Sequence, residues 1–105
     1  TMYKATWSEF EVQSLAFSIL RKNLYPNYLV RGEYKFDKCR IDIAIFKAHK
    51  DKEPPLTCVV EIKRNPNGST TSQGTRYELM LGVPCIYIRG GEEAYKVLEL
   101  VSPYL

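Results

Sequence analysis

Two carboxylates and a lysine stand in segments that are otherwise apolar, and their types fit the hydrolysis of a phosphodiester bond. Asp42 interrupts one such segment, and Glu61 and Lys63 end another. Phosphodiester hydrolysis needs a hard cation with oxygen ligands, and magnesium is commonly held by one or two carboxylates while it keeps several waters. A nearby lysine can orient the attacking water and offset negative charge on the phosphate. Asp42, Glu61 and Lys63 are therefore candidate catalytic residues.

The segment around Asp42, residues Arg40–Phe46, alternates in the way that a β-strand does. Because strand side chains point to opposite faces in turn, the acid and the isoleucines are expected on different faces. The two sets are Asp42, Ala44 and Phe46 on one face, and Ile41, Ile43 and Ile45 on the other. An unpaired charge on so apolar a strand costs several kcal/mol, so Asp42 needs a partner. The ordinary explanation is that Asp42 accepts hydrogen bonds from backbone amides at a strand end.

The segment Thr57–Lys63 has a similar strand pattern, and its alternation puts Glu61 and Lys63 on one face together with Val59. The opposite face carries Cys58, Val60 and Ile62. The ordinary explanation here is a partly exposed salt bridge between Glu61 and Lys63. The catalytic interpretation is favoured by the acid on the preceding strand, Asp42, and by the projection of Lys63 on the same face as Glu61.

Periodicity and turn signals along the chain predict the order of elements αβββαβα around these two strands. A helix over Ser8–Asn23 begins with the capping-box pair Ser8 and Glu11. A loop over Ala48–Leu56 contains the pair Pro54-Pro55, which cannot sit in a central strand. The other expected elements are a strand over Tyr28–Phe36, forming a hairpin with Arg40–Phe46, a helix over Ser72–Leu81, a strand over Pro84–Ile88 and a helix over Gly91–Val101.

Asp42 in RIDIAIF, followed by Glu61 and Lys63 in CVVEIKR, resembles the bipartite motif of the PD-(D/E)XK nuclease superfamily. The resemblance spans nearly the whole chain, because that superfamily has an αβββαβ core, to which the expected order adds a C-terminal helix. One departure is that Ile41, and not proline, precedes Asp42. The resemblance implies an α/β fold of the restriction endonuclease-like type, a mixed central sheet flanked by helices, and a hydrolase that uses Mg²⁺, with Mn²⁺ as a substitute.

In Holliday-junction resolvases and some restriction enzymes of this superfamily, a glutamate on the first helix joins the metal site. Glu9 and Glu11 are both candidates for this role. Glu9 is favoured because it lies one turn before Gln13 at the flank of the apolar face, whereas Glu11 points away and suits the capping box. The resemblance thus implies Glu9 as a third metal ligand, with Glu11 as the alternative.

Gln73 and Tyr77 have the spacing Gln-x-x-x-Tyr, which resembles an additional motif of RecB-like nucleases and of the nuclease domains of type I restriction subunits. One helical turn would bring the two side chains together, so they could face phosphate or the metal waters. A core tyrosine with a nearby capping glutamine is an equal alternative. Gln73 is a candidate catalytic residue, and Tyr77, Arg64 and Arg76 are candidate DNA-binding residues.

Length and composition limit the class of protein. A chain of 105 residues with 45% hydrophobic residues suffices for one packed core, so a single domain over residues 1–105 is expected. No stretch resembles a membrane helix or a signal peptide, which predicts a cytoplasmic protein with no membrane partner. Three dispersed cysteines and one histidine suit neither a disulfide framework nor a zinc site. The net charge of +3 permits a polyanionic partner without identifying one.

Two main hypotheses of function follow from these residues. The first is an endonuclease that cleaves DNA. The second is a DNA-binding or assembly subunit of a restriction or mobile-element excision system, in which a protein partner supplies the cleavage. A homodimer is expected under either hypothesis, and the little surface that so short a chain leaves for a separate specificity domain supports the second one. An unrelated small α/β domain is a third alternative. The intact set Asp42, Glu61 and Lys63 favours the first, because a structural subunit has no reason to keep these groups among apolar neighbours.

Overall fold

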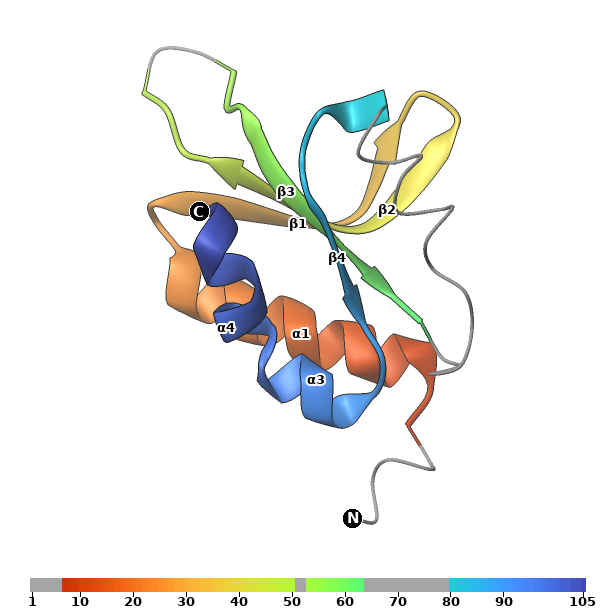
Figure 1. The fold of residues 1–105 in the computed structure, drawn as a ribbon. Helices are drawn as coiled ribbons and strands as arrows, with labels where there is room; N and C mark the ends of the chain where they lie inside the picture. Colours follow the sequence, from red (N-terminus) through yellow and green to blue (C-terminus); the bar gives the residue numbers. More distant parts are fainter. Residues whose placement is uncertain (1–6, 51–52, 64–79) are drawn as a thin grey trace.

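The protein, in the computed structural model described here for residues 7–50, 53–63 and 80–105, has a mixed sheet of four strands with helices packed on one face (Figure 1). The elements in chain order are α1 (Glu9–Leu24), β1 (Tyr28–Phe36), β2 (Cys39–Lys47), β3 (Leu56–Ile62), β4 (Cys85–Ile88), α3 (Gly91–Tyr95), α4 (Val97–Val101) and the 3₁₀ turn η1 (Ser102–Tyr104). The α/β class and the mixed sheet expected from the sequence are thereby confirmed.

Helix α1 begins at the predicted capping box. The Glu11 amide donates to Ser8 Oγ at 3.2 Å, and the Ser8 amide donates to Glu11 Oε1 at 3.0 Å. These two bonds satisfy amide groups that the first helical turn leaves without a partner. The helix buries one apolar stripe, Val12, Ala16, Leu20 and Leu24, at the spacing that the sequence predicts.

The sheet has the strand order β1-β2-β3-β4. β1 pairs with β2 and β2 pairs with β3 in antiparallel fashion, whereas β3 and β4 are parallel. Each strand lies within one residue at either end of its predicted range, and β1 matches Tyr28–Phe36 at both ends. The parallel pair brings Cys85–Ile88 beside the end of β3, where Glu61 stands.

Two clusters of buried side chains cover the two faces of the sheet. On the helical face, the cluster joins α1, α3 and α4 to β2 and β3, with members such as Leu20, Ile43 and Val60. On the other face, Ile41, Ala44 and Val59 are fully buried with partly buried neighbours that include Tyr34 and Phe46. We call these the helical cluster and the second cluster.

The single helix predicted over Gly91–Val101 is wrong, because the structure has two short helices that break at Lys96. Lys96 adopts φ −96° and ψ 7°, and its amide bonds to the Glu93 carbonyl, three residues back, so the α-helical ladder is interrupted. Apolar spacing had identified the buried positions, Ala94, Val97 and Val101 among them, but spacing alone does not detect such a break.

The helix predicted over Ser72–Leu81 lies outside the described residues except for its end. Met80 and Leu81 are helical, and Gly82 follows them with φ 70°, as expected for a glycine that ends a helix. None of the helices that the structure describes combines the length and the apolar character that a membrane crossing requires.

Candidate functional site

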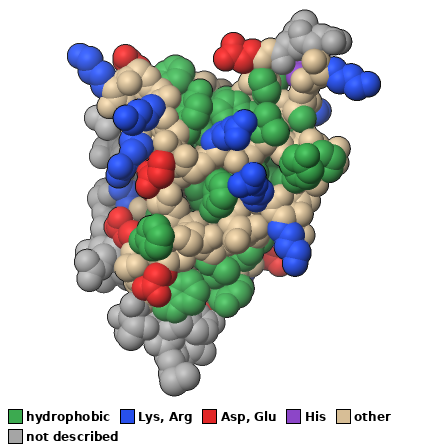
Figure 2. Space-filling view, turned by 180° about the vertical axis from the view of Figure 1, so that it is seen from behind, with side chains coloured by type: hydrophobic (Ala, Val, Ile, Leu, Met, Phe, Trp, Pro, Cys, Tyr) green, Lys and Arg blue, Asp and Glu red, His purple; other side chains and the backbone are tan. Residues whose placement is uncertain are grey.

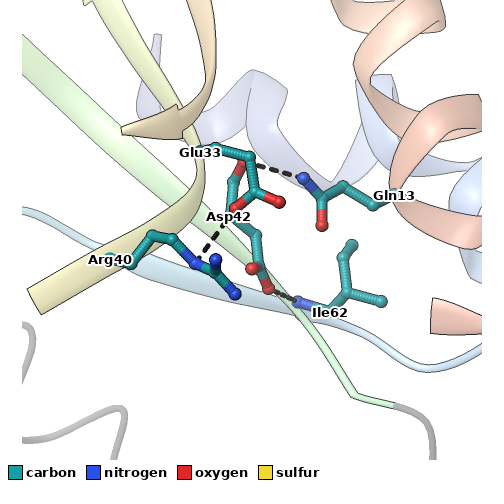
Figure 3. A network of polar contacts seen from close by, with 5 residues as sticks. All are labelled: Gln13, Glu33, Arg40, Asp42 and Ile62. Carbon is teal, nitrogen blue, oxygen red and sulfur yellow. Dashed lines mark hydrogen bonds and ion pairs between the residues drawn. The ribbon is translucent and has the colours of Figure 1, made fainter. Parts of the chain in front are cut away.

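Asp42 and Glu61 lie where β2 and β3 diverge. The ladder between these strands runs from Phe46–Leu56 to Ile43–Val60, so it ends one step short of the two acids. The carboxylate of Asp42 bridges the divergence, because its Oδ2 accepts a hydrogen bond from the Ile62 amide at 2.8 Å (Figure 3). β3 meanwhile remains paired with β4 through Ile62.

The face alternation of β2 changes at Asp42, and here the prediction was wrong for one residue. Ile41 packs in the second cluster with Ala44, not in the helical cluster with Ile43. Opposite this point in β1, Glu33 has φ 51°, and the β1–β2 ladder lacks the pair Glu33–Asp42 although the register is the same on both sides of it. This irregularity leaves Asp42 free to direct its carboxylate along the sheet toward β3.

Glu61 is the buried acid of the site, with only 4% of its surface exposed. The pKa of its carboxyl is raised to about 8. Burial is the largest cause, and the hydrogen bond and negative charge of Asp42 act in the same direction, while the Asp42 backbone amide and the charge of Lys63 act in the opposite one. Within the described residues, Glu61 Oε1 is buried and has no hydrogen-bond partner. An acceptor in this state can receive a proton donor or a cation.

Lys63 follows β3 directly and stays attached to β4, since its amide donates to the Ile88 carbonyl at 2.8 Å. Its Nζ lies 5.8 Å from the centre of the Tyr87 ring, within the range of a cation–π contact. Tyr87 is the register partner of Glu61 across the parallel pair. Tyr87 was not among the site residues predicted from the sequence, although a tyrosine among the apolar residues of this strand was a readable signal.

The first helix contributes Gln13 to the surroundings of the site. Gln13 Nε2 donates to the Asp42 carbonyl at 3.3 Å, which ties α1 to β2 beside the acid (Figure 3). Glu11 is engaged in the capping box, as expected. Glu9 lies on the exposed first turn of α1, one turn before Gln13, and the structure does not bring its carboxylate together with those of Asp42 and Glu61.

Four sequence-based candidates, Gln73, Tyr77, Arg64 and Arg76, lie outside the described residues. Across residues 7–50, 53–63 and 80–105, no three side chains of His, Cys, Asp or Glu are grouped closely enough to hold a metal ion. The acids that the structure brings together are therefore two, Asp42 and Glu61.

The two carboxylates suit a hard divalent cation in their chemistry. Both offer oxygen donors, and the orphaned Oε1 of Glu61 is the kind of buried acceptor that a cation would satisfy. Magnesium typically takes one or two protein carboxylates and completes its shell with water and substrate phosphate. Asp42 and Glu61 are the residues that would hold it here.

Comparison of the chain with models of protein families, with curated proteins and with solved structures found no match.

Proposed function

We propose that this protein is a Mg²⁺-dependent endonuclease that hydrolyses DNA phosphodiester bonds and has a fold of the restriction endonuclease-like type. The observation that carries the proposal is the pair of acids at the divergence of β2 and β3, with a buried Glu61 oxygen that lacks a described partner. Such a pair is costly for stability unless a ligand uses it. Lys63, two residues after Glu61, adds the positive charge that phosphate chemistry needs.

Each side chain has a distinct part in this proposal. Asp42 and Glu61 bind the cation, and Mg²⁺, when bound, supplies positive charge to the phosphate oxygens. Lys63 orients the attacking water and stabilises charge on the phosphate. Tyr87 holds the lysine in place through its ring. Glu9 and Gln73 remain candidates for the outer part of the site.

Cleavage assays with plasmid, single-stranded and branched DNA, in the presence of Mg²⁺ or Mn²⁺, test the proposal. Asp42→Asn and Lys63→Ala should abolish cutting, whereas Glu33→Gln, which removes an exposed acid paired with Arg40 at 3.2 Å, should leave it intact. Millimolar Mg²⁺ should also raise the melting temperature of the wild type but not of Asp42→Asn. A wild type that binds DNA without cutting it would instead favour the partner-dependent subunit.

We also expect a homodimer located in the cytoplasm. Sedimentation equilibrium of the purified protein tests the dimer, and fractionation of cells that express the tagged chain tests the location.

A further inference from the structure

A groove of about 170 Å³ opens on the sheet face opposite the helices. Apolar, aromatic and charged side chains line it, namely Leu29, Arg31, Tyr34, Phe46, Glu53 and Pro54. The rings of Tyr34 and Phe46 meet edge to face, with their centroids 5.2 Å apart. The groove thus joins flat aromatic surface to a cation. Figure 2 shows Lys and Arg side chains among hydrophobic ones on this rear view of the molecule.

Arg31 is the cation of this groove, and its charge is available to a ligand. The side chain is exposed and forms no ion pair with any residue that the structure describes. Arg40, on the neighbouring strand, differs in this respect because it is paired with Glu33 at 3.2 Å. An unpaired arginine beside aromatic rings can bind a phosphate while the rings bind a flat apolar group.

The register of the sheet relates this groove to the candidate site. Arg31 pairs with Ala44, and Ala44 pairs with Val59, so the three side chains share one row and one face. Glu61 stands two residues beyond Val59 on β3. From the spacings of a regular sheet, Arg31 and Glu61 are separated by about 10 Å across the strands and by about 7 Å along the strand direction. A strand of nucleic acid that reaches the acids can therefore also reach the groove.

From these relationships we infer that the groove binds one unpaired nucleotide of the substrate strand, with its base against Tyr34 and Phe46 and its phosphate on Arg31. This inference rests on the proposed nuclease function and specifies its substrate class as single-stranded or locally unpaired DNA. A base must leave its own stack to lie on protein rings, and every base offers such a face whatever the sequence. Glu53 on the groove wall repels phosphate, which directs the backbone toward Arg31.

Binding of a fluorescent oligodeoxythymidylate, measured by anisotropy in EDTA, tests the groove without the need for cleavage. Arg31→Gln should weaken binding about tenfold, as for the loss of one charged hydrogen bond, and lower the salt slope by about 0.7. Phe46→Leu, which stays apolar but replaces the ring with a smaller aliphatic side chain, should weaken it at least about fivefold. Arg21→Gln is the matched control, since Arg21 is also exposed and lies 5.9 Å from the Phe17 ring, outside the groove.

Several outcomes would overturn the proposal that the groove binds an unpaired nucleotide. These are equal weakening by Arg31→Gln and Arg21→Gln, tighter binding of duplex than of single strand, or displacement of the oligonucleotide by an acidic peptide as readily as by unlabelled strand. Melting curves confirm that Phe46→Leu is folded. The nuclease function and the groove can fail separately. DNA binding that depends on Arg31 without metal-dependent cleavage would support the groove and reject the nuclease function. Metal-dependent cleavage that is unaffected by Arg31→Gln would support the nuclease function and reject the groove.

Discussion

The Asp42 carboxylate accepts a hydrogen bond from the Ile62 amide at 2.8 Å, at the point where the backbone ladder between β2 and β3 has ended. A side chain thereby replaces the backbone carbonyl that a regular strand pair would provide. The same carboxylate is a cause of the raised pKa of Glu61. Asp42 therefore supports the fold and sets the electrostatics of the site at once.

The two roles of Asp42 can be separated by substitution. Asp42→Ala leaves the Ile62 amide without its acceptor and should lower the free energy of unfolding by about 1–3 kcal/mol, whereas Asp42→Asn retains an oxygen acceptor and should lower it less. Both should abolish cleavage. Urea denaturation at pH 5, where Glu61 is protonated in the folded state, gives the comparison without charge repulsion. Equal stability of the alanine variant and the wild type would show that the bond contributes nothing.

The pKa of Glu61 predicts how stability depends on pH in the absence of metal. Its pKa is about 8 in the folded protein against an ordinary value of 4.5, so between these values the folded state keeps a proton that the unfolded state releases. The free energy of unfolding should therefore fall as pH rises from about 4.5 to about 8, by on the order of a few kcal/mol, and then level off.

Urea denaturation in EDTA across this range checks the prediction, with Glu61→Gln as the control that cannot ionise. The glutamine variant should lack this fall and should be more stable than the wild type at pH 8. If the two profiles run parallel, Glu61 ionises as an ordinary exposed glutamate does.

Substitutions of Glu9 and Glu11 should have different effects, because Glu11 stabilises helix α1 whereas Glu9 is a candidate for the cleavage site. Glu11→Ala removes half of the capping box and should lower the free energy of unfolding by about 1 kcal/mol, with cleavage retained. Glu9→Ala should reduce cleavage at least tenfold if its carboxylate serves the site. Melting curves and cleavage rates of both variants decide the matter, and full activity of Glu9→Ala removes Glu9 from the site.

Tyr87 should position Lys63 through its ring. Tyr87→Leu removes a cation–π contact worth about 0.5–2 kcal/mol, so kcat should fall about 2- to 30-fold with little change in KM. Tyr87→Phe keeps the ring and should retain most of the rate. Single-turnover cleavage at saturating DNA measures the effect, and equal losses in the two variants would point to the hydroxyl instead of the ring.

Local patterns in the sequence predicted those parts of the fold that local interactions determine. The capping box at Ser8, the alternation of the strands and the apolar stripe of α1 all depend on neighbours in the chain, and the structure agrees with each except for the face of Ile41. The placement of Asp42 and Glu61 on two neighbouring strands was predicted too, because each acid could be assigned to its own strand.

The remaining features depend on contacts between distant segments. The change of face at Asp42 coincides with the positive φ of Glu33 in another strand, and the place of Tyr87 beside Glu61 depends on how two parallel strands align. The break at Lys96 depends on how the last helices pack. Tyr87 stands out in the sequence of its own strand, but the contacts between distant segments that these features involve have no signature in the neighbouring residues.

The divergence of β2 and β3 also determines how the sheet should respond to a ligand. Asp42 lies in β2, and Glu61 lies in β3, which is paired with β4. Where the backbone ladder between β2 and β3 has ended, the two strands are joined through Asp42, which accepts the hydrogen bond from the Ile62 amide and interacts with the Glu61 carboxyl. A cation bound by both acids would link the ends of β2 and β3 across this divergence. Deuterium uptake at the Ile62 and Lys63 amides should then slow when the cation binds, while the far end of the sheet exchanges as before. Binding at the site would thus make this end of the sheet locally more rigid.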